Sequence, residues 1–497
     1  MPSLRAPLAA GLALALVLVL FARGGPPAEA ATINVTKTND TADGACNSDC
    51  SLREAIIAAN ANPGADVVNV PAGTYTLTIS GQNEDAAATG DLDIKSSFLT
   101  ISGAGASSTI IDGGGVDRVF DVQQTLISIS ISGLTVRNGS AGSIASGGGI
   151  WIRNSSMVTL TNVVVDSNSA GTNGGGISNA GNLSVTGSTI SRNLVTAPGA
   201  VGGGIHVATS TGNLTITNST VSGNISSGSG GGISNYHTAT LTNLTITGNQ
   251  GFGGGGAYNN NGFSATTTVK NTIIAGNAAN NGPDCNGNVS SQGYILVQNA
   301  SGCTISGVST GNLIGPNPFL GPLADNGGPT QTHEIFFGSP AINNGGAGCP
   351  STDQRGAPRV GVCDIGSFEY GSSPGPAPTP TPSPTPTPVP TPTPSPTPTS
   401  PPPSGGTAGN VDCSGGGNPV DAVDGLKILR WVAGLQVSQN EPCTNPGDAM
   451  TSGGNPYIQG DVDCSGIVNA VDALKILRWL AGLPISLGEC PPLETQV

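Results

Sequence analysis

The sequence predicts an all-β right-handed parallel β-helix, followed after a proline-rich linker by a small α-helical module. The chain has 497 residues with 77 glycines, and only 9 % of its residues are charged and 4 % aromatic. Such a composition is typical of a repetitive β architecture. A Gly-Gly-Gly-Ile motif or a close variant recurs with its first glycine at 147, 174, 202, 230 and 254. A self-similar period in this range indicates a solenoid.

Each repeat has the same internal pattern. After the glycines comes a polar turn and then an alternating segment such as NLSVTGSTI or NLTITNSTV. Alternating β-branched and polar residues predict strands with one buried face, and a coil of this size relies on stacking for stability. Each repeat ends in an asparagine, which predicts a turn whose stacked amides bond along the solenoid: Asn168, Asn193, Asn224, Asn249 and Asn277.

Residues 1–30 predict a cleaved export signal. Met1–Arg5 carries one positive charge, an apolar run follows, and Ala28-Glu29-Ala30 fits the cleavage rule. The alternative, an uncleaved membrane anchor, is disfavoured because the run is short for a spanning helix. We therefore expect a secreted, extracellular protein associated with the cell surface, without a transmembrane segment after cleavage. The net charge of −14 argues against nucleic acid as a partner.

Export also makes disulfides the expected state of the ten cysteines. Nearest-neighbour pairing joins Cys46 to Cys50, Cys285 to Cys303, and Cys349 to Cys363. The remaining four cysteines lie near the C-terminus and allow three connectivities: Cys413, Cys443, Cys464 and Cys490.

Two segments flank the repeats, and together with them form the predicted domain 31–370. CSLREAIIAAN (50–60) predicts a short helix with Ser51 and Glu54 as a capping box. Its apolar stripe of Ala55, Ile56 and Ala59 would cover the first coil. Beyond the repeats the glycine period is lost, and we expect a C-terminal cap containing His333–Glu334 and Asp353–Arg355 as salt bridges or hydrogen bonds.

The motifs of these flanks resemble a known family. CSLREA, GDLDI and IDGGGVDRVF resemble the CSLREA-type bacterial β-helix proteins, and NPFLGPLADNGGPTQTH, DQRGAPR and DIGSFE resemble the choice-of-anchor Q domain. The resemblance spans roughly residues 31–370. It implies a pectin-lyase-like β-helix that is exported and held at the surface by a variable C-terminal device, and it implies no particular reaction.

The regular repeats contain few residues for catalysis. Asp166 is their only acid; Arg153, Arg192 and Lys270 are their only strong bases, and we expect His206 and His237 to be solvated. One carboxylate cannot form the pair that a glycosidase needs. The acidic set lies upstream. Its spacing of about one coil would allow Asp91 and Asp93 to stack on Asp112, but the favoured interpretation is that these are structural turn and cap residues. The full set is Asp91, Asp93, Asp112, Asp117 and Asp121, with Arg118.

The segment 371–406 predicts a linker. Proline occupies every second position from Pro374 to Pro398, mostly as Thr-Pro, which favours a semi-rigid polyproline II spacer. Beyond it, residues 407–497 contain a duplication: VDAVDGLKILRWVAGL (420–435) matches VNAVDALKILRWLAGL (468–483), and NVDCSG and DVDCSG precede the two copies.

The second copy predicts a calcium loop. Calcium loops place oxygen ligands at positions 1, 3, 5, 7, 9 and 12, with glycine at 6. Counted from the start of DVDCSGIVNAVD, the ligands are Asp461, Asp463, Ser465, the Ile467 carbonyl, Asn469 through water, and Asp472.

The first copy predicts a weaker calcium site, because an insertion leaves position 7 unassignable and position 1 is an uncharged asparagine. Its ligands are Asn410, Asp412, Ser414, Asp421 and Asp424.

Paired loops that end in Asp and are each followed by a single helix resemble a type I dockerin. The resemblance implies a cohesin-type partner on a scaffold or cell surface. It also implies recognition residues along each helix, although the lysines and arginines among them would otherwise be solvated surface residues. These are Ala422, Val423, Lys427 and Arg430, and Ala470, Val471, Lys475 and Arg478.

Two functions are therefore carried forward. The first is a surface-attached β-helix protein with an adhesive or polysaccharide-binding body. The alternative is a polysaccharide lyase or glycoside hydrolase on the same fold. Three or more carboxylates converging on one groove, with Arg or Lys nearby, would favour the enzyme.

Overall fold

The computed structural model describes residues 29–82, 84–124, 127–153, 156–208, 212–260, 265–375, 449–452 and 455–458. The chain divides into two units, Met1–Thr381 and Pro382–Val497. Of the second unit the structure describes one antiparallel hairpin, β34 (Ala449–Ser452) with β35 (Asn455–Ile458). No helix within the described ranges is long and apolar enough to cross a membrane.

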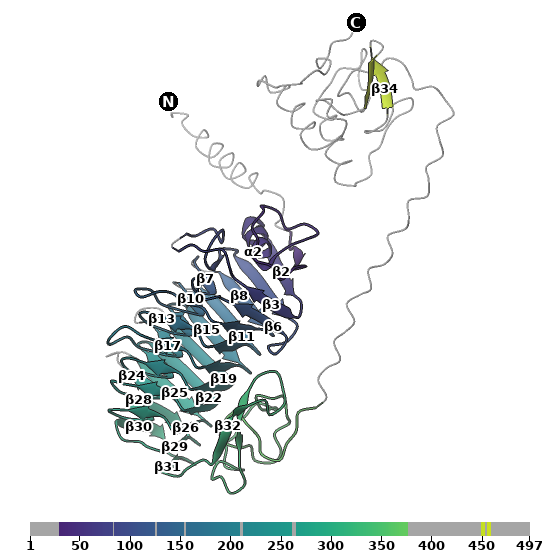
Figure 1. The fold of residues 1–497 in the computed structure, drawn as a ribbon. Coiled ribbons are helices and arrows are strands. Elements are labelled where there is room, and N and C mark those ends of the chain that lie inside the picture. The colour runs from purple at the N-terminus through teal and green to yellow at the C-terminus, as the bar shows by residue number, and fades with distance from the viewer. Residues whose placement is uncertain are drawn as a thin grey trace, which may run out of the picture. The chain divides into compact units, whose positions relative to one another are not determined.

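The first unit is a parallel β-helix whose strands stack in four columns (Figure 1). Column 1 contains β4 (Leu92–Ile94), β7 (Phe120–Val122), β10 (Ile150–Ile152), β14 (Ile177–Asn179), β18 (Ile205–Val207), β21 (Ile233–Asn235), β24 (Tyr258–Asn260) and the start of β28 (Cys285–Gln292). Column 2 contains β1 (Thr32–Asn34), β2 (Ala65–Val70), β5 (Phe98–Gly103), β8 (Ser128–Ser132), β11 (Met157–Thr161), β15 (Asn182–Thr186), β19 (Asn213–Ser222), β22 (Thr238–Thr247), β25 (Thr266–Lys270), the rest of β28, and β30 (Cys303–Val308).

Column 3 contains β3 (Gly73–Thr76), β6 (Thr109–Asp112), β9 (Thr135–Arg137), β12 (Val164–Asp166), β16 (Thr189–Ser191), the second halves of β19 and β22, β26 (Ile273–Ala275), β29 (Leu296–Val297) and β31 (Leu313–Ile314). Column 4 contains β13 (Ser169–Ala170), β17 (Leu194–Val195), β20 (Ile225–Ser226), β23 (Gln250–Gly251) and β27 (Ala278–Ala279). All these pairings are parallel, as the repeat predicted.

Like residues stack in register inside the β-helix. Ile150 pairs with Ile177, Ile177 with Ile205, and Ile205 with Ile233, and all four are fully buried. The glycine motif precedes the column 1 strands β10, β14, β18, β21 and β24, because the backbones crowd there. Gly174, for example, has φ +68°, and a Cβ on Gly175 would lie 2.5 Å from the Leu194 carbonyl oxygen. The 28-residue period thus encodes both the core stack and the tight turn before it.

The predicted asparagine ladder is present and buried. Each side-chain amide donates from Nδ2 to the Oδ1 of the next asparagine at 2.9–3.0 Å, and that Oδ1 also accepts the backbone N–H of the preceding one. The ladder ends on a carboxylate, because Asn277 donates to Asp284. Its members are Asn168, Asn193, Asn224, Asn249 and Asn277.

The helix α2 (Leu52–Ala61) covers the first coil as expected. The Ser51 hydroxyl accepts from the Glu54 N–H at 3.1 Å, and the Glu54 carboxylate accepts from the Ser51 N–H at 2.7 Å. Burial opposes ionisation of Glu54, but hydrogen bonds from Ser51, Thr41 and Asp43 outweigh it and lower its pKa to about 2. Ala55, Ile56 and Ala59 are fully buried, which confirms the predicted apolar stripe.

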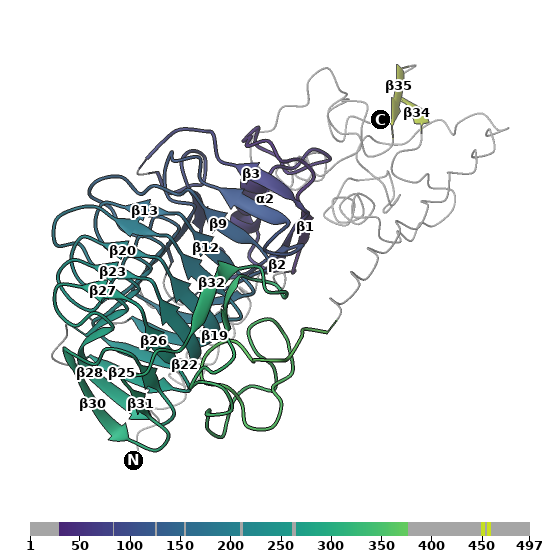
Figure 2. The same cartoon turned by 60° about the horizontal axis from the view of Figure 1, so that its bottom comes forward.

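The C-terminal segment 316–375 corrects the expectation of an end cap, because it lies along the side of the β-helix on column 3. Thr189 donates to the Gln331 carbonyl and Thr220 to Gln354 Oε1, both at 2.6 Å. Figure 2 shows its hairpin, β32 (Leu320–Ala324) with β33 (Thr332–Ile335), beside the column 3 strands. A small second core lies beneath it, including Ile273, Ala275, Leu296, Ile335, Ala341, Ile365 and Phe368. The loss of the glycine period in the sequence indicates where the coils end, but it does not indicate where the following segment packs.

Of the two local interactions predicted for this segment, the Asp353–Arg355 pair is confirmed, whereas His333 bonds to residues other than Glu334, whose side chain is exposed. Asp353 and Arg355 form a buried ion pair at 2.7 Å, and His333 hydrogen-bonds to Ser222 Oγ and to the Gly321 carbonyl, both at 2.8 Å.

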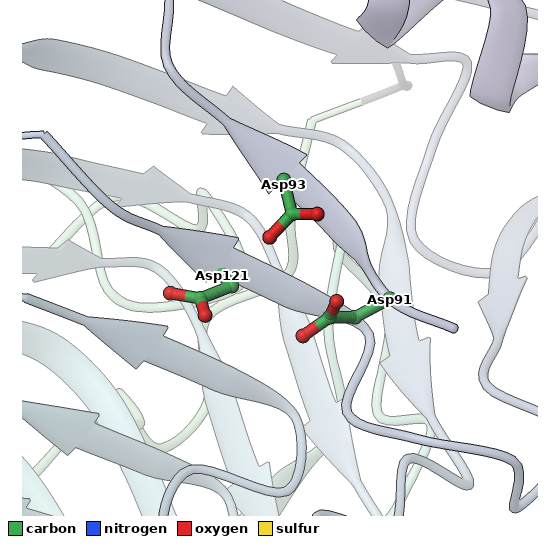
Figure 3. A group of neighbouring side chains, drawn as sticks. All are labelled: Asp91, Asp93 and Asp121. Atoms are coloured by element: carbon green, nitrogen blue, oxygen red, sulfur yellow. The ribbon is translucent and has the colours of Figure 1, made fainter. Parts of the chain in front are cut away.

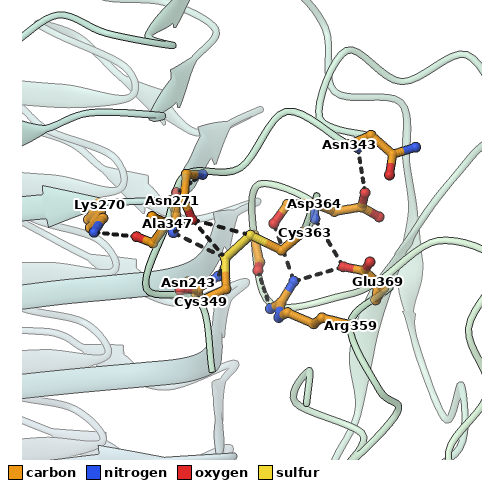
Figure 4. Close-up of a disulfide and its surroundings, with 12 residues drawn as sticks. Asn243, Lys270, Asn271, Asn343, Ala347, Cys349, Arg359, Cys363, Asp364 and Glu369 are labelled. Atoms are coloured by element: carbon orange, nitrogen blue, oxygen red, sulfur yellow. Dashed lines mark hydrogen bonds and ion pairs between the residues drawn. A yellow bond between two sulfur atoms is a disulfide. The ribbon is translucent and has the colours of Figure 1, made fainter. Parts of the chain in front are cut away.

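All three nearest-neighbour disulfides of the first unit are present. Cys349–Cys363 fastens the C-terminal segment to itself beside the turns at Asn243 and Asn271 (Figure 4). The two Nδ2 atoms lie 3.3 and 3.2 Å from Cys349 Sγ. This disulfide therefore contacts the coils that the segment covers.

Candidate functional site

The outer face of column 1 has a continuous row of polar and aromatic side chains. In its three-residue strands the first and third side chains enter the core, so the middle one points outward. Register places these middle residues one above another, and we call them the outer row: Asp93, Asp121, Trp151, Ser178, His206 and Ser234.

An acidic cluster occupies the N-terminal end of the outer row. Carboxylate oxygens of Asp91, Asp93 and Asp121 all lie within 4.8 Å of one another (Figure 3). The three residues are only 2 %, 0 % and 1 % exposed.

The stacking of Asp91 and Asp93 on Asp112 that the spacing allowed does not occur. Asp112 lies in column 3 and pairs with Arg137 at 2.8 Å, whereas the residue in register with Asp93 is Asp121. Spacing along the chain indicates how far apart two residues are in coils but not which column each occupies.

Two arginines hold the cluster together. Arg118 Nη1 lies 2.8 Å from Asp91 Oδ2 and 3.3 Å from Asp121 Oδ2. Arg153 Nε donates to Asp121 Oδ1 at 2.9 Å. Both guanidinium groups lie over the Trp151 ring, at 4.9 Å for Arg118 and 4.2 Å for Arg153 from its centroid. Trp151 is half-buried, so one edge of this stack reaches solvent.

The first coil supplies the remaining support. Asp93 accepts from the Ala87 N–H at 2.7 Å and from the Gln123 side-chain amide. Arg53 of α2 is fully buried, pairs with Asp40 at 2.7 Å, and donates to the carbonyls of Ala87, Gly90 and Asp91. The capping helix thus fixes the loop that presents Asp91, a role that no local sequence signal for Arg53 indicated.

Burial shifts the acid–base behaviour of the cluster. It raises the pKa of Asp91 to about 8, although Arg118 opposes the shift, and it raises the pKa of Asp93 to about 7. The pKa values of Asp117 and Asp121 are also raised, mainly by burial. The cluster therefore holds protons near neutral pH, where carboxyl groups with such pKa values can serve as general acids.

The geometry limits what this cluster can do. Three carboxylates are a donor set for a hard cation, but Arg118 already bridges Asp91 and Asp121 and occupies that role. An inverting glycosidase needs carboxyl groups roughly 6.5–9.5 Å apart with a water between them, and here the oxygens are closer and shielded from solvent. The condition set for an enzyme is met in part: carboxylates converge beside arginines, but they are buried rather than set in a groove.

The remaining candidates in the repeats have structural partners. The expectation that His206 is solvated is wrong, because the ring is 9 % exposed and lies edge-on to Tyr236 at 5.4 Å. Its burial lowers the pKa of His206 to about 4, so the ring is neutral. Asp166 pairs with Arg192 at 2.8 Å, and Lys270 donates to the Ala347 carbonyl at 2.6 Å.

The predicted calcium ligands and recognition residues, between 410–430 and 461–478, lie outside the described residues.

No family model and no curated protein matches the chain. Among solved structures, the chain is similar to the crystal structure of pectate lyase Pel9A, with 16 % identity and a TM-score of 0.40, covering 69 % of this chain and 97 % of that one. It is also similar to ORF18 of Geobacillus virus E2, with 14 % identity and a TM-score of 0.22, covering 63 % and 64 %. Neither likeness transfers an activity to this chain.

Proposed function

We propose that the protein is an extracellular, surface-attached β-helix protein that binds polysaccharide along the outer row. The observation that carries the proposal is the stack of Trp151 with Arg118 and Arg153 above the acidic cluster. The solvent-exposed edge of the Trp151 ring offers an apolar contact, and the neighbouring charged groups offer hydrogen bonds, which together suit the mixed surface of a sugar. Because both guanidinium groups are already fixed by carboxylates, the surface is ordered before a ligand arrives.

Binding of the full chain to a panel of pectins, alginate and arabinogalactans, measured by affinity electrophoresis, tests this. Trp151→Ala should weaken binding at least about tenfold, since a central aromatic contact contributes most of such an interface. Thr159→Ala, on the exposed face of column 2, is the matched control and should bind as the wild type does. Unchanged binding by Trp151→Ala would contradict the proposal.

The attachment part of the proposal rests on the duplicated C-terminal loops and their resemblance to a type I dockerin. Calcium calorimetry on the full chain should show one tight and one weaker site, with Asp472→Ala removing the tight one and Asp424→Ala the weaker one. Calcium-dependent capture of a cohesin-type protein from the cell surface would follow from intact loops. A heat of calcium binding that neither substitution changes would contradict the assignment of these loops and remove the support for this attachment.

A second candidate function, a polysaccharide lyase or glycoside hydrolase, is favoured by one observation. Asp91 and Asp93 have pKa values raised to about 8 and about 7 beside two arginines. Turnover of any of the same polysaccharides, abolished by Asp93→Asn while binding persists, would establish it. Binding without turnover supports the first proposal.

A further inference from the structure

The last coil of the β-helix leaves its core open. In column 3 the inward-facing residues Val221, Ile246, Ile274, Val297 and Ile314 stack in register. The first four are at most 1 % exposed, whereas Ile314 in the final coil is 50 % exposed. An inward-facing isoleucine with half of its surface in water marks a core layer that no described segment covers.

Column 2 ends in the same way. Val289 is buried, but Ile305, its partner in the final coil, is only partly buried, and Thr304, Ser306, Gly307 and Val308 are exposed. Among the described residues, β30 pairs only with β28, and β31 only with β29. Every second residue of β30 therefore directs its backbone N–H and C=O groups away from the molecule, as on any sheet edge.

The opposite end of the β-helix is closed. There α2 packs on the first coil, with Ala55 and Ile56 fully buried in the core; Val68 is 0 % exposed, and Ile33, its partner in the first strand, is partly buried. At the C-terminal end the chain turns back along column 3 instead of crossing the last coil. Among the described residues both ends have an unpaired strand edge, but α2 packs over the core at one end, whereas the inward-facing Ile314 is half exposed at the other.

We propose that this open end binds the open end of a second copy of the chain, giving a two-fold, tail-to-tail dimer. Another strand can replace water on an edge of backbone donors and acceptors, and a second β-helix end presents the same strand spacing and the same apolar layer. The sequences of β30 (CTISGV) and β31 (LI) contain no charged residue and no proline. They therefore carry neither a like-charge barrier to self-pairing nor the residues that usually block edge pairing.

The closed end determines the symmetry. Because α2 covers the first coil, head-to-tail stacking into a filament is blocked, and the contact that remains is isologous and ends at two copies. A two-fold axis through this contact sets β30 antiparallel to β30 of the second copy. Equivalent residues near the middle of β30, such as Ser306, then approach one another across the axis.

Light scattering and sedimentation of the full chain over a range of concentrations test the dimer. We expect mass to rise from monomer to dimer and no further. Thr304→Lys combined with Val308→Lys places two exposed charges at the edge and should raise the dissociation constant by at least about tenfold. Thr159→Lys combined with Thr215→Lys, at exposed positions of β11 and β19, is the matched control and should leave the dimer intact.

A second variant tests the symmetry independently of the charge. Ser306→Cys should give a disulfide-linked dimer on mild oxidation, and Thr159→Cys should not. A monomer at every concentration overturns the proposal. So does a dimer that survives the edge lysines or fails to cross-link at Ser306, since its contact would then lie elsewhere. Unchanged thermal unfolding of each variant shows that the fold is intact.

Discussion

The β-helix contains two buried polar rows that run from coil to coil, and they differ in charge. The asparagine ladder consists of neutral amides, and each Oδ1 accepts two hydrogen bonds from the preceding asparagine. The acidic cluster of column 1 combines carboxylates and arginines, and burial raises the pKa of each of Asp91, Asp93, Asp117 and Asp121. The neutral amides of the ladder hydrogen-bond to one another and stabilise the fold. The carboxyl groups of the cluster, whose ionisation is opposed by burial, can still take up and release protons near neutral pH.

The difference follows from the repeat. Burying an asparagine at every turn has a small free-energy cost, because each amide is the hydrogen-bond partner of the next one. The ladder therefore extends as far as the period does. The acidic cluster lies where the coils are irregular and draws partners from α2, from the loop before β4, from the turn before β7 and from the residue after β10. The periodic row supports the architecture, and the aperiodic one is the candidate site.

Breaking the ladder should give the largest effect. Asn224→Ala removes the acceptor of the Asn193 amide and backbone N–H and the donor to the Ile190 carbonyl. Each buried group left without a partner costs about 1–3 kcal/mol, so we expect a loss of about 3–5 kcal/mol in denaturant unfolding. Asn182→Ala, at an exposed position of β15, should cost less than about 0.5 kcal/mol. Equal losses from the two substitutions would mean that the ladder is not what stabilises the coils.

Neutralising the acidic cluster should change the pH dependence of stability. Because the pKa of Asp93 is raised to about 7 in the folded protein from an ordinary 3.8, the folded state binds the proton more tightly. Its contribution is thus fully present below pH 4 and is lost as pH rises through 7. Asp93→Asn should make the melting temperature depend less on pH between these limits. The corresponding change in the free energy of unfolding is at most about 4 kcal/mol.

Glu54 provides a control of opposite sign, because hydrogen bonds lower its pKa to about 2. Its contribution is present above about pH 4.5 and is lost as pH falls through 2. Glu54→Gln should therefore flatten only the acidic limb. A neutral limb that Asp93→Asn leaves unchanged would show that this carboxyl is ionised in the folded state.

The same contrast explains how much could be predicted from sequence. The columns, the ladder, the capping box and three disulfides follow from local patterns that recur or lie close together. The register of Asp93 on Asp121 depends on the lengths of irregular coils, and the roles of Arg53 and Arg153 depend on loops folding back on them. The path of residues 316–375 along column 3 depends on a side surface that alternation alone does not reveal. Each failure involves a contact between segments distant in sequence and outside the period.

The smallest expected effect comes from Asp284, a buried carboxyl group that stands at the end of the amide ladder. Asp284 ends the amide ladder: its Oδ1 accepts the Asn277 amide at 3.0 Å and its Oδ2 accepts the Asn299 N–H at 2.7 Å. Burial raises the pKa of Asp284 above its ordinary value despite these bonds. Asp284→Asn keeps the Oδ1 acceptor but loses the acceptor for Asn299, which should cost about 1 kcal/mol.

In the wild type, Asp284 should lower stability as pH rises above 3.8, because a raised folded pKa favours the protonated folded state. The Asp284→Asn protein should not show this decline. Thermal melts of both proteins at acidic and neutral pH measure the two effects together. If an asparagine here matched wild type at acidic pH and exceeded it at neutral pH, a fully amide ladder would be the more stable ending and the charge would be a cost to the fold. If the variant were weaker at both pH values by the same amount, Asp284 would behave as one more neutral member of the ladder. Charge, rather than position in the repeat, would then be what separates the ladder from the acidic cluster.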